Sequence, residues 1–248
     1  MLFTVIYFIF GIIIGSFLNV VIYRLPLSLS IISPRSHCTS CKKNIPFYFN
    51  FPILSYIILY GKCKNCKKKI SIQYPIVEAL TGILFIYAFN NLSIPNALFF
   101  CAISSLLICI AMIDFNHYII SLSLSLILLL LIIPYVIISN DYIYHLYGMM
   151  VGFSYLSFIF LLTWLFSKQQ PMGYGDLILI ILLGLLLGPL KILLTIFFSA
   201  IIGLIYWVLI TIIKGYEKNK KLPFGTFLSI TSIIIFAIQI NWDLFRNF

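Results

Sequence analysis

Eight apolar runs, of which the sixth is short, constrain the fold of this chain more than any other feature. They cover residues 2–23, 75–89, 94–113, 118–138, 146–166, 177–187, 190–213 and 222–242. A helix that crosses a bilayer needs about 20 apolar residues. Of the 248 residues, 62% are hydrophobic and 9% are charged, too few charges to cover a soluble domain. The sequence therefore predicts an all-α polytopic membrane protein with about eight transmembrane helices, and it excludes soluble enzymes, coiled coils and disordered tails.

The basic residues predict which side of the membrane each loop faces. Nine of the sixteen Lys and Arg residues lie between Arg24 and Lys69, and four more lie in 214–221. Basic residues in short loops favour the cytoplasmic face. Alternating crossings place all of them inside except Lys191 and Arg246. We therefore expect a protein of the cytoplasmic membrane with its N-terminus outside, and we attribute the net charge of +10 to topology rather than to nucleic-acid binding.

The segment 24–75 is too polar and too rich in Cys, Lys and Pro to cross a membrane. The first run has no basic residue before it and no small-residue cleavage site, so we expect a permanent span rather than a signal peptide. The sequence thus predicts three parts: a first transmembrane helix over 1–23, a small cytoplasmic domain over 24–75, and a seven-helix membrane core over 76–248.

Four cysteines of the cytoplasmic segment form two CxxC pairs, Cys38-x2-Cys41 and Cys63-x2-Cys66. Two such pairs can close a four-thiolate tetrahedral zinc site, and a reducing cytosol disfavours disulfides. Metal binding would also supply folding energy that a domain of this size lacks. We predict a structural zinc ion here, with a redox CxxC or unligated thiols as the alternatives.

Two aspartates, Asp114 and Asp176, each lie at the cytoplasmic end of an apolar run. A carboxyl group at the bilayer boundary is costly, which makes it a candidate for function. The predicted topology puts both at the same depth, so they can meet. Two carboxyl groups in contact share a proton and can together activate a water and protonate a leaving group, as in aspartic proteases. We expect the bare backbone of Gly173 and Gly175 to let an extended substrate approach.

Less specific interpretations of the two acids stay open at this point. Asp176 could simply cap a helix after a glycine turn, and Asp114 could be an interfacial residue that reaches toward water. A proton-coupled transporter could use the pair as a relay. Transporters usually place such acids near the midplane of repeated halves, however, and no repeat is evident here.

The motifs around these residues resemble the type IV prepilin peptidase family, whose members are leader peptidases and N-methyltransferases. The opening segment is Gly15-Ser16-Phe17-Leu18-Asn19-Val20-Val21-Ile22-Tyr23-Arg24-Leu25-Pro26. After the two CxxC pairs come Ile113-Asp114 with His117, Gly173-Tyr174-Gly175-Asp176 with Gly184 and Gly188, and Pro223-Phe224-Gly225 with Phe227. The resemblance runs in order over nearly the whole chain.

The resemblance implies a bacterial membrane aspartic endopeptidase with Asp114 and Asp176 as its catalytic pair. It implies cleavage of type IV prepilins or pseudopilins after a leader Gly on the cytoplasmic face, and methylation of the new N-terminus by S-adenosylmethionine. No Gly-rich nucleotide fingerprint is visible, and we expect the methyl donor near the zinc domain and Glu78, a carboxylate that could bind an amine or simply pin helices. A presenilin-like or signal-peptide-peptidase-like protease is an alternative, which the double CxxC domain disfavours.

The chain departs from the family pattern at two places beside the aspartates. Ser121-Leu122 stands where the family usually has Pro-Asp or Pro-Asn, and Leu177-Ile178 stands where the second residue is usually Lys. The catalytic acids remain, so the resemblance keeps the same chemistry. We expect the missing Lys to alter substrate anchoring or the protonation of the pair.

Overall fold

The computed structural model describes residues 2–46, 51–139, 141–167, 172–215 and 221–245, and all named elements in these residues are helices. The helices are α1 (Leu2–Arg24), the 3-10 turn η1 (Leu25–Leu27), α2 (Leu54–Ile58), α3 (Gln73–Asn91), α4 (Ile94–His117), α5 (Leu122–Ile138), α6 (Tyr142–Ser167), α7 (Tyr174–Leu187), α8 (Pro189–Lys214) and α9 (Phe224–Phe245). Four basic residues in the predicted charge asymmetry, Lys168, Lys218, Lys220 and Arg246, lie outside the described residues.

Each of the eight predicted apolar runs forms one helix, which confirms the helical interpretation of the hydropathy pattern. Two boundaries differ from the prediction. Helix α5 begins at Leu122 rather than at Tyr118, because Tyr118 has φ 57°, a conformation that a helix cannot contain. Helix α7 begins three residues before the run does, so that Asp176 lies inside its first turn.

Among the described residues, four stretches are long and apolar enough to cross a membrane: Leu2–Leu27, Ile94–His117, Tyr142–Phe166 and Pro189–Lys214. Shorter apolar helices cover Leu122–Ile138, Tyr174–Leu187 and Phe224–Ile238. A helix rises 1.5 Å per residue, so these shorter helices reach less far across a hydrocarbon core of about 30 Å. The chain is a multi-pass membrane protein.

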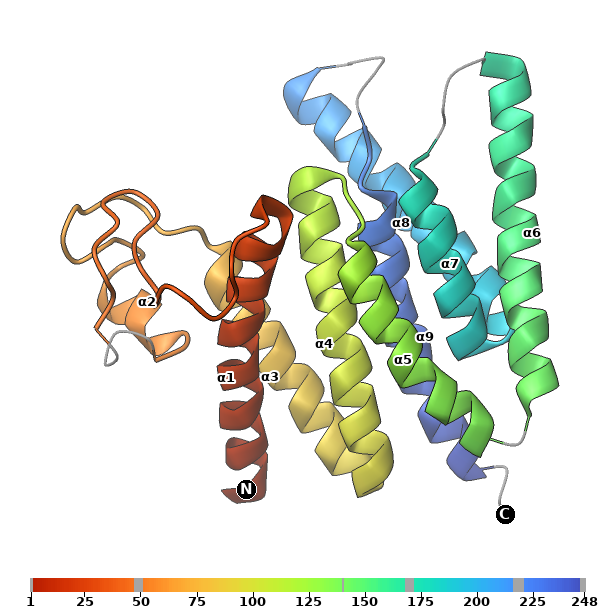
Figure 1. Cartoon of the computed structure of the whole chain (residues 1–248), viewed down its shortest axis with the longest axis horizontal. Helices are drawn as coiled ribbons and strands as arrows, with labels where there is room; N and C mark the ends of the chain where they lie inside the picture. Colours follow the sequence, from red (N-terminus) through yellow and green to blue (C-terminus); the bar gives the residue numbers. More distant parts are fainter. Residues whose placement is uncertain (1, 47–50, 140, 168–171, 216–220, 246–248) are drawn as a thin grey trace. The chain divides into compact units, whose positions relative to one another are not determined.

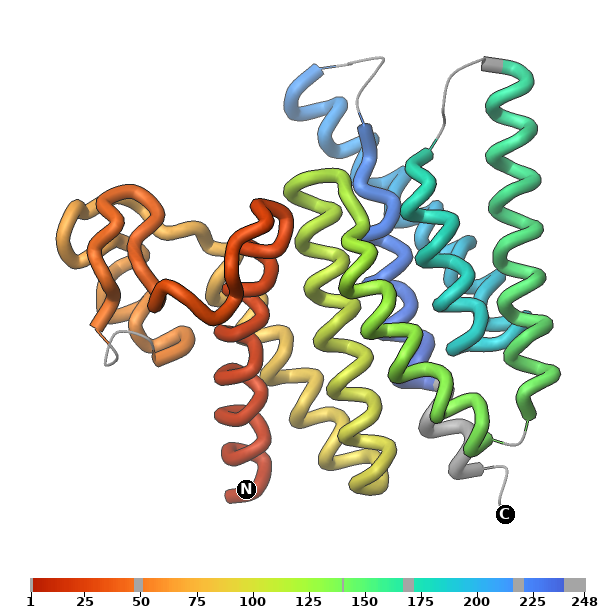
Figure 2. Tube along the Cα trace, viewed as in Figure 1, coloured from red at the N-terminus to blue at the C-terminus, as the bar shows by residue number. Residues whose placement is uncertain are grey.

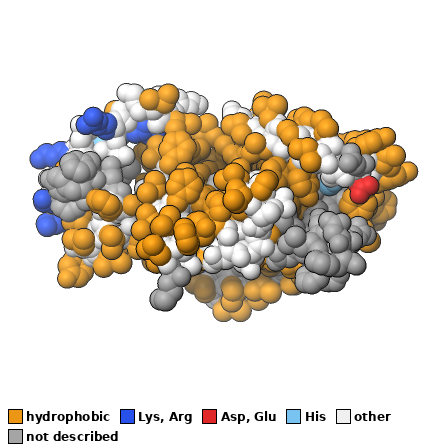
Figure 3. Space-filling model, turned by 90° about the horizontal axis from the view of Figure 1, so that it is seen from below, with side chains coloured by type: hydrophobic (Ala, Val, Ile, Leu, Met, Phe, Trp, Pro, Cys, Tyr) orange, Lys and Arg blue, Asp and Glu red, His pale blue; other side chains and the backbone are white. Residues whose placement is uncertain are grey.

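The burial pattern is the reverse of that in a soluble protein. Large apolar side chains such as Leu130 (67% exposed) and Ile212 (76% exposed) lie on the surface, whereas Ser199, Ser229 and Ser232 are completely buried. Hydrophobic side chains cover much of the face in Figure 3, and the Lys and Arg side chains visible there gather in one group. Such a distribution suits lipid outside the helices and small hydroxyl side chains between them.

The structure divides into two compact units, Met1–Ser105 and Leu106–Phe248, and α4 contains the division. In the first unit, α1 and α3 cross in close contact (Figure 1). Two glycines one helical turn apart make this possible. A Cβ on Gly11 would lie 2.7 Å from the Gly82 Cα, and one on Gly15 would lie 2.7 Å from the Glu78 Cα. The Gly11-xxx-Gly15 spacing is therefore a helix-packing motif in this chain.

The second unit holds the end of α4 and helices α5 to α9. Helices α6 and α7 lie side by side (Figure 2) because Gly148 and Gly184 let their backbones touch: a Cβ on Gly184 would lie 2.5 Å from the Gly148 carbonyl oxygen. Helices α8 and α9 are joined by a buried hydrogen bond of 2.5 Å between the hydroxyls of Ser199 and Thr231. Asp114, near the end of α4, and Asp176, near the start of α7, both belong to this unit.

Candidate active site and metal centre

Asp114 lies in the last turn of α4, where its side chain is only 5% exposed. The helix ends three residues later, at His117. The Tyr118 N–H donates a 2.8 Å hydrogen bond to the Asp114 carbonyl oxygen, which closes the last turn. The apolar helix α4 thus has one carboxyl group near its C-terminal end, and this group is buried.

Asp176 lies in the first turn of α7 and is 8% exposed. Gly173 precedes the helix in an extended conformation, φ −73° and ψ 147°, and its carbonyl oxygen accepts a 3.1 Å hydrogen bond from the Asp176 N–H. The first turn of a helix presents unpaired N–H groups and a partial positive charge, which stabilise a carboxylate.

The first turn of α9 contacts both aspartates. The Oδ2 of Asp114 accepts a 2.7 Å hydrogen bond from the N–H of Thr226 and a 3.0 Å hydrogen bond from its hydroxyl. The Asp176 carboxyl interacts with the Gly225 N–H and, electrostatically, with Asp114. The structure therefore brings together the two acids that the topology predicted to meet, although they are far apart in the sequence.

Thr226 makes the closest polar contacts with Asp114, although no sequence motif predicted it. It follows the quoted block Pro223-Phe224-Gly225 directly, at the start of a predicted helix. The free N–H groups of a helix's first turn are natural partners for a carboxylate. The predicted helix start therefore offered a possible partner for a carboxylate. The sequence does not show, however, which of several helix starts faces Asp114.

The two glycines before Asp176 differ in their surroundings. Gly175 is helical, and a Cβ there would lie 2.9 Å from the Cβ of Ile120. Gly173 is open, since a Cβ there would meet nothing closer than the Asp176 Oδ2 at 3.7 Å. Ile120 also lies beside Gly225, whose added Cβ would approach the Ile120 Cδ1 to 2.9 Å. At Gly175, the closely packed neighbour is therefore Ile120 of this chain. The approach of a substrate backbone to Gly173 stays a prediction.

The residues that differ from the family pattern, at 121–122 and 177–178, lie close in sequence to the two aspartates, which are themselves present. Ser121 precedes α5 as its cap residue, and its carbonyl oxygen accepts hydrogen bonds from the N–H and the hydroxyl of Ser125 at 3.0 and 3.1 Å. Ile178 is half-buried two residues after Asp176 on α7. Residues two apart on a helix do not share a face. A side chain at 178 therefore points away from the direction that Asp176 takes.

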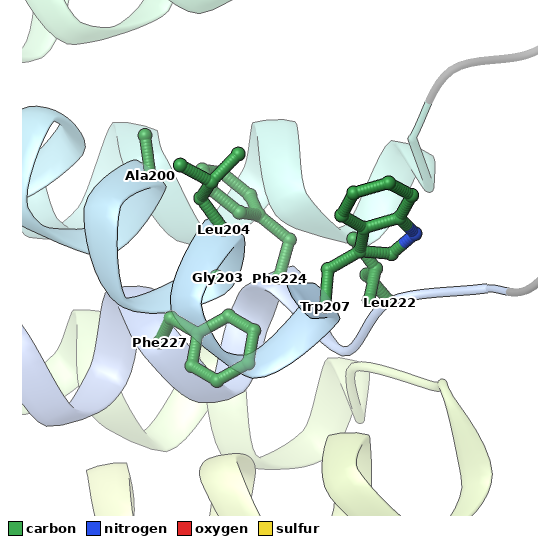
Figure 4. Close-up of a pocket in the computed structure, with 7 residues that line it drawn as sticks. All are labelled: Ala200, Gly203, Leu204, Trp207, Leu222, Phe224 and Phe227. Carbon is green, nitrogen blue, oxygen red and sulfur yellow. The ribbon is translucent and has the colours of Figure 1, made fainter. Parts of the chain in front are cut away.

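A small apolar pocket adjoins the first turn of α9 (Figure 4), with a volume of about 310 Å³. Its walls come from α8 and from the start of α9: Ala200, Gly203, Leu204, Trp207, Leu222, Phe224 and Phe227. Phe224 and Phe227 stand on either side of Gly225 and Thr226 in the sequence. The polar contacts to the aspartates are thus bordered by apolar side chains.

The four predicted zinc ligands converge in the first unit. The sulfurs of Cys38, Cys41, Cys63 and Cys66 all lie within 4.8 Å of one another, and those of Cys38 and Cys66 are 3.8 Å apart. A tetrahedral zinc ion with Zn–S bonds of about 2.3 Å places its sulfurs about 3.8 Å apart. The donor set and its spacing therefore fit a zinc ion.

The two CxxC pairs have the same backbone geometry. The Cys38 carbonyl accepts from the Lys42 N–H at 2.9 Å, and the Cys63 carbonyl accepts from the Lys67 N–H at 3.0 Å. Lys42 and Lys67 both have positive φ, 55° and 57°. Each pair is thus a tight turn that aims two thiols at one point.

Backbone N–H groups also favour the thiolate form of the first cysteine in each pair. The N–H groups of Cys41 and Ser40 donate to the Cys38 sulfur and lower its pKa to about 6. The N–H groups of Cys66 and Asn65 lower the pKa of Cys63 in the same way. Because zinc binds thiolates rather than thiols, these contacts prepare the cluster for a metal ion.

Glu78, the expected neighbour of the methyl donor, is a buried residue of α3 that faces α1 and the cytoplasmic segment. Its Oε2 accepts a 2.7 Å hydrogen bond from the Ile53 N–H, and the Ser16 hydroxyl also donates to the carboxyl group. Ile53 has φ 61°, so this contact holds a strained residue in place. These partners favour a structural role for Glu78, in which its carboxyl group holds α3, α1 and the cytoplasmic segment together. We place no step of methyl transfer at Glu78.

Comparisons with known proteins match most of the chain. Residues 9–92 match the Bacterial Peptidase A24 N-terminal domain, and residues 101–208 match the Type IV leader peptidase family. No solved structure is significantly similar to the chain.

Similar proteins from several bacteria are named "Prepilin leader peptidase/N-methyltransferase", and three of them show the extent of the match. A Bacillus subtilis protein is 33% identical over 232 residues, which cover 92% of each chain. A Neisseria gonorrhoeae protein is 30% identical over 273 residues, 94% of this chain and 91% of the relative. A Myxococcus xanthus protein is 33% identical over 217 residues, 86% of this chain and 65% of the relative. Their shared identity over most of the chain shows that it belongs to the type IV leader peptidase family.

Proposed function

We propose that this protein is a membrane aspartic endopeptidase that removes the leader of type IV prepilins or pseudopilins and methylates the new N-terminal residue with S-adenosylmethionine. The family and the names of its relatives support the two activities. The observation that carries the peptidase is the pairing of two buried carboxyl groups, Asp114 and Asp176, against one helix start. A family resemblance alone would not place them together.

The pair can hydrolyse a peptide bond without a covalent intermediate. One carboxylate takes a proton from a bound water, and the water oxygen attacks the carbonyl carbon of the leader Gly. The other carboxyl group gives its proton to the carbonyl oxygen. When the tetrahedral intermediate collapses, the C–N bond breaks and the departing amine receives a proton from the pair. We assign both catalytic roles to the pair as a unit, since coupled acids titrate together.

The open backbone at Gly173 supports a place for the scissile segment beside Asp176. A glycine there leaves room that a side chain would fill, and it caps the N-terminus of α7 three residues before Asp176. We assign Gly175 to the packing of α7 against Ile120. The substrate's apolar helix would remain in the bilayer while its leader meets the pair.

The cysteine cluster supports a structural zinc ion held by Cys38, Cys41, Cys63 and Cys66 in the segment 24–75. A zinc tetrathiolate carries a formal charge of −2, and the segment offers lysines but no acidic residue around it. The ion would supply folding energy to the segment and takes no part in the proposed hydrolysis. The membrane parts in this proposal are the first helix, 1–23, and a seven-helix core, 76–248.

The proposed topology has eight spans, with both ends outside and the zinc domain and active site facing the cytoplasm. Two exposed serines at opposite ends of α3, Ser71 and Ser93, provide a matched test. We expect a membrane-impermeant thiol reagent added to intact cells to label Ser93→Cys and to spare Ser71→Cys. Breaking the cells should expose the second. Labelling of Ser71→Cys in intact cells would reverse the orientation.

Processing of a prepilin in cells tests the function itself. The chain is expressed together with a prepilin of one of its relatives in a host that lacks a prepilin peptidase. We expect the prepilin to shorten by its leader, as it does with the relative's own enzyme in a parallel culture. An unprocessed prepilin beside a membrane-inserted chain and an active relative would contradict the proposal.

A further inference from the structure

Two consecutive residues in the first turn of α9 lie beside the two aspartates. The Thr226 N–H donates a 2.7 Å hydrogen bond to the Asp114 Oδ2, and the Gly225 N–H interacts with the Asp176 carboxyl. Within a helix, neighbouring backbone N–H groups keep a regular spacing. The start of α9 therefore presents two backbone N–H groups to the two carboxyl groups.

The hydroxyl of Thr226 adds a second contact with a different property. Its oxygen lies 3.0 Å from the Asp114 Oδ2 and 2.9 Å from the Ala111 carbonyl oxygen. A hydroxyl has one proton to donate and two lone pairs that accept. When Asp114 is ionised, the hydroxyl can donate to it. When Asp114 is protonated, the hydroxyl can accept the carboxyl proton and donate its own to Ala111.

We propose that Thr226 is a positioning residue of the peptidase, which keeps Asp114 in place in both of its protonation states. This inference rests on the proposed function, because only a carboxyl that changes protonation during turnover needs such a partner. Thr226 is itself 5% exposed and lies 112 residues from Asp114. A buried hydroxyl placed between a carboxyl and a carbonyl group has no access to water that could replace it.

Three substitutions in α9 separate this role from packing. Thr226→Val keeps the shape and the N–H but loses the hydroxyl, whereas Thr226→Ser keeps both donors. Thr231→Val makes the same chemical change on the same helix, at a buried hydroxyl that bonds Ser199 and the Phe227 carbonyl instead. All three are assayed as full chains in lipid nanodiscs with a prepilin substrate.

We expect Thr226→Val to lower kcat by about 10- to 100-fold, the effect of losing a hydrogen bond to a charged group. KM should stay within about twofold, because the hydroxyl contacts the acid and not the substrate. Thr226→Ser should restore kcat to near the wild-type value, and Thr231→Val should leave it there.

A Thr226→Val enzyme with the same kcat as Thr231→Val would overturn the inference, as would a serine variant no better than valine. If the valine variant is recovered poorly, Thr226→Cys replaces it, since a thiol is a weak donor. These outcomes concern Thr226 alone. Failure of the wild type to cleave the prepilin would instead reject the proposed function.

Discussion

Replacing either aspartate of the pair by asparagine should reduce leader cleavage at least about 1,000-fold. An amide neither accepts the water's proton nor donates one to the carbonyl oxygen, and general acid–base catalysis contributes factors of this size. The amide oxygen introduced by Asp114→Asn could still accept the Thr226 N–H, so the fold should survive. The measurement is the initial rate of prepilin cleavage by Asp114→Asn and Asp176→Asn in nanodiscs, at equal protein recovery.

Asp141 is the matched control for these two substitutions. It is an exposed acid at the start of α6, and Asp141→Asn makes the same chemical change away from the pair. We expect this variant to cleave at the wild-type rate. If Asp114→Asn or Asp176→Asn kept more than about a tenth of the wild-type rate, the assignment of the pair would be wrong.

The second large effect is expected at the cysteine cluster. The purified protein should contain one zinc ion per chain, and Cys63→Ser should lose nearly all of it. Removing one thiolate breaks a tetrahedral site whose apparent binding free energy is about 10–16 kcal/mol in small zinc domains. Elemental analysis measures the zinc, and limited proteolysis should show the 24–75 segment becoming sensitive.

Cys101→Ser is the control, because Cys101 is buried in α4 and lies outside the four-sulfur cluster. It should retain one zinc ion. Acidification should release zinc from the wild type as the thiolates take up protons, including Cys38, whose pKa is already lowered to about 6 by backbone N–H groups. Zinc content far below one per chain in the wild type, and unchanged in Cys63→Ser, would reject the metal site.

The helices of this chain follow from its hydropathy because each apolar run is separated from the next by polar residues or by glycine and proline. The short helix α2 (Leu54–Ile58) could not be foreseen in this way, since five residues carry no period. The hydropathy pattern did not predict that α7 begins at Tyr174, because glycine and aspartate are typical of loops. In the structure, Asp176 lies in the first turn, where the helix dipole stabilises an acidic residue.

The site was foreseen where spacing or topology determined it. The CxxC spacing predicted the cysteine cluster, and the charge asymmetry put Asp114 and Asp176 at one depth. Thr226 and the Ile53 contact of Glu78 were not foreseen, because each joins residues far apart in sequence through backbone groups that all residues share. Hydropathy predicts which helices form, but the packing of the helix ends determines which backbone N–H groups bond to a carboxyl group.

The mass of a prepilin's N-terminus after incubation with the purified protein tests the central claim most directly. With S-adenosylmethionine present, we expect a product that lacks the leader after its Gly and is one methylene heavier than the unmethylated product. The Asp114→Asn, Asp176→Asn double variant should leave the prepilin intact. Cleavage at the same bond by the double variant, or no cleavage by the wild type, would contradict the account.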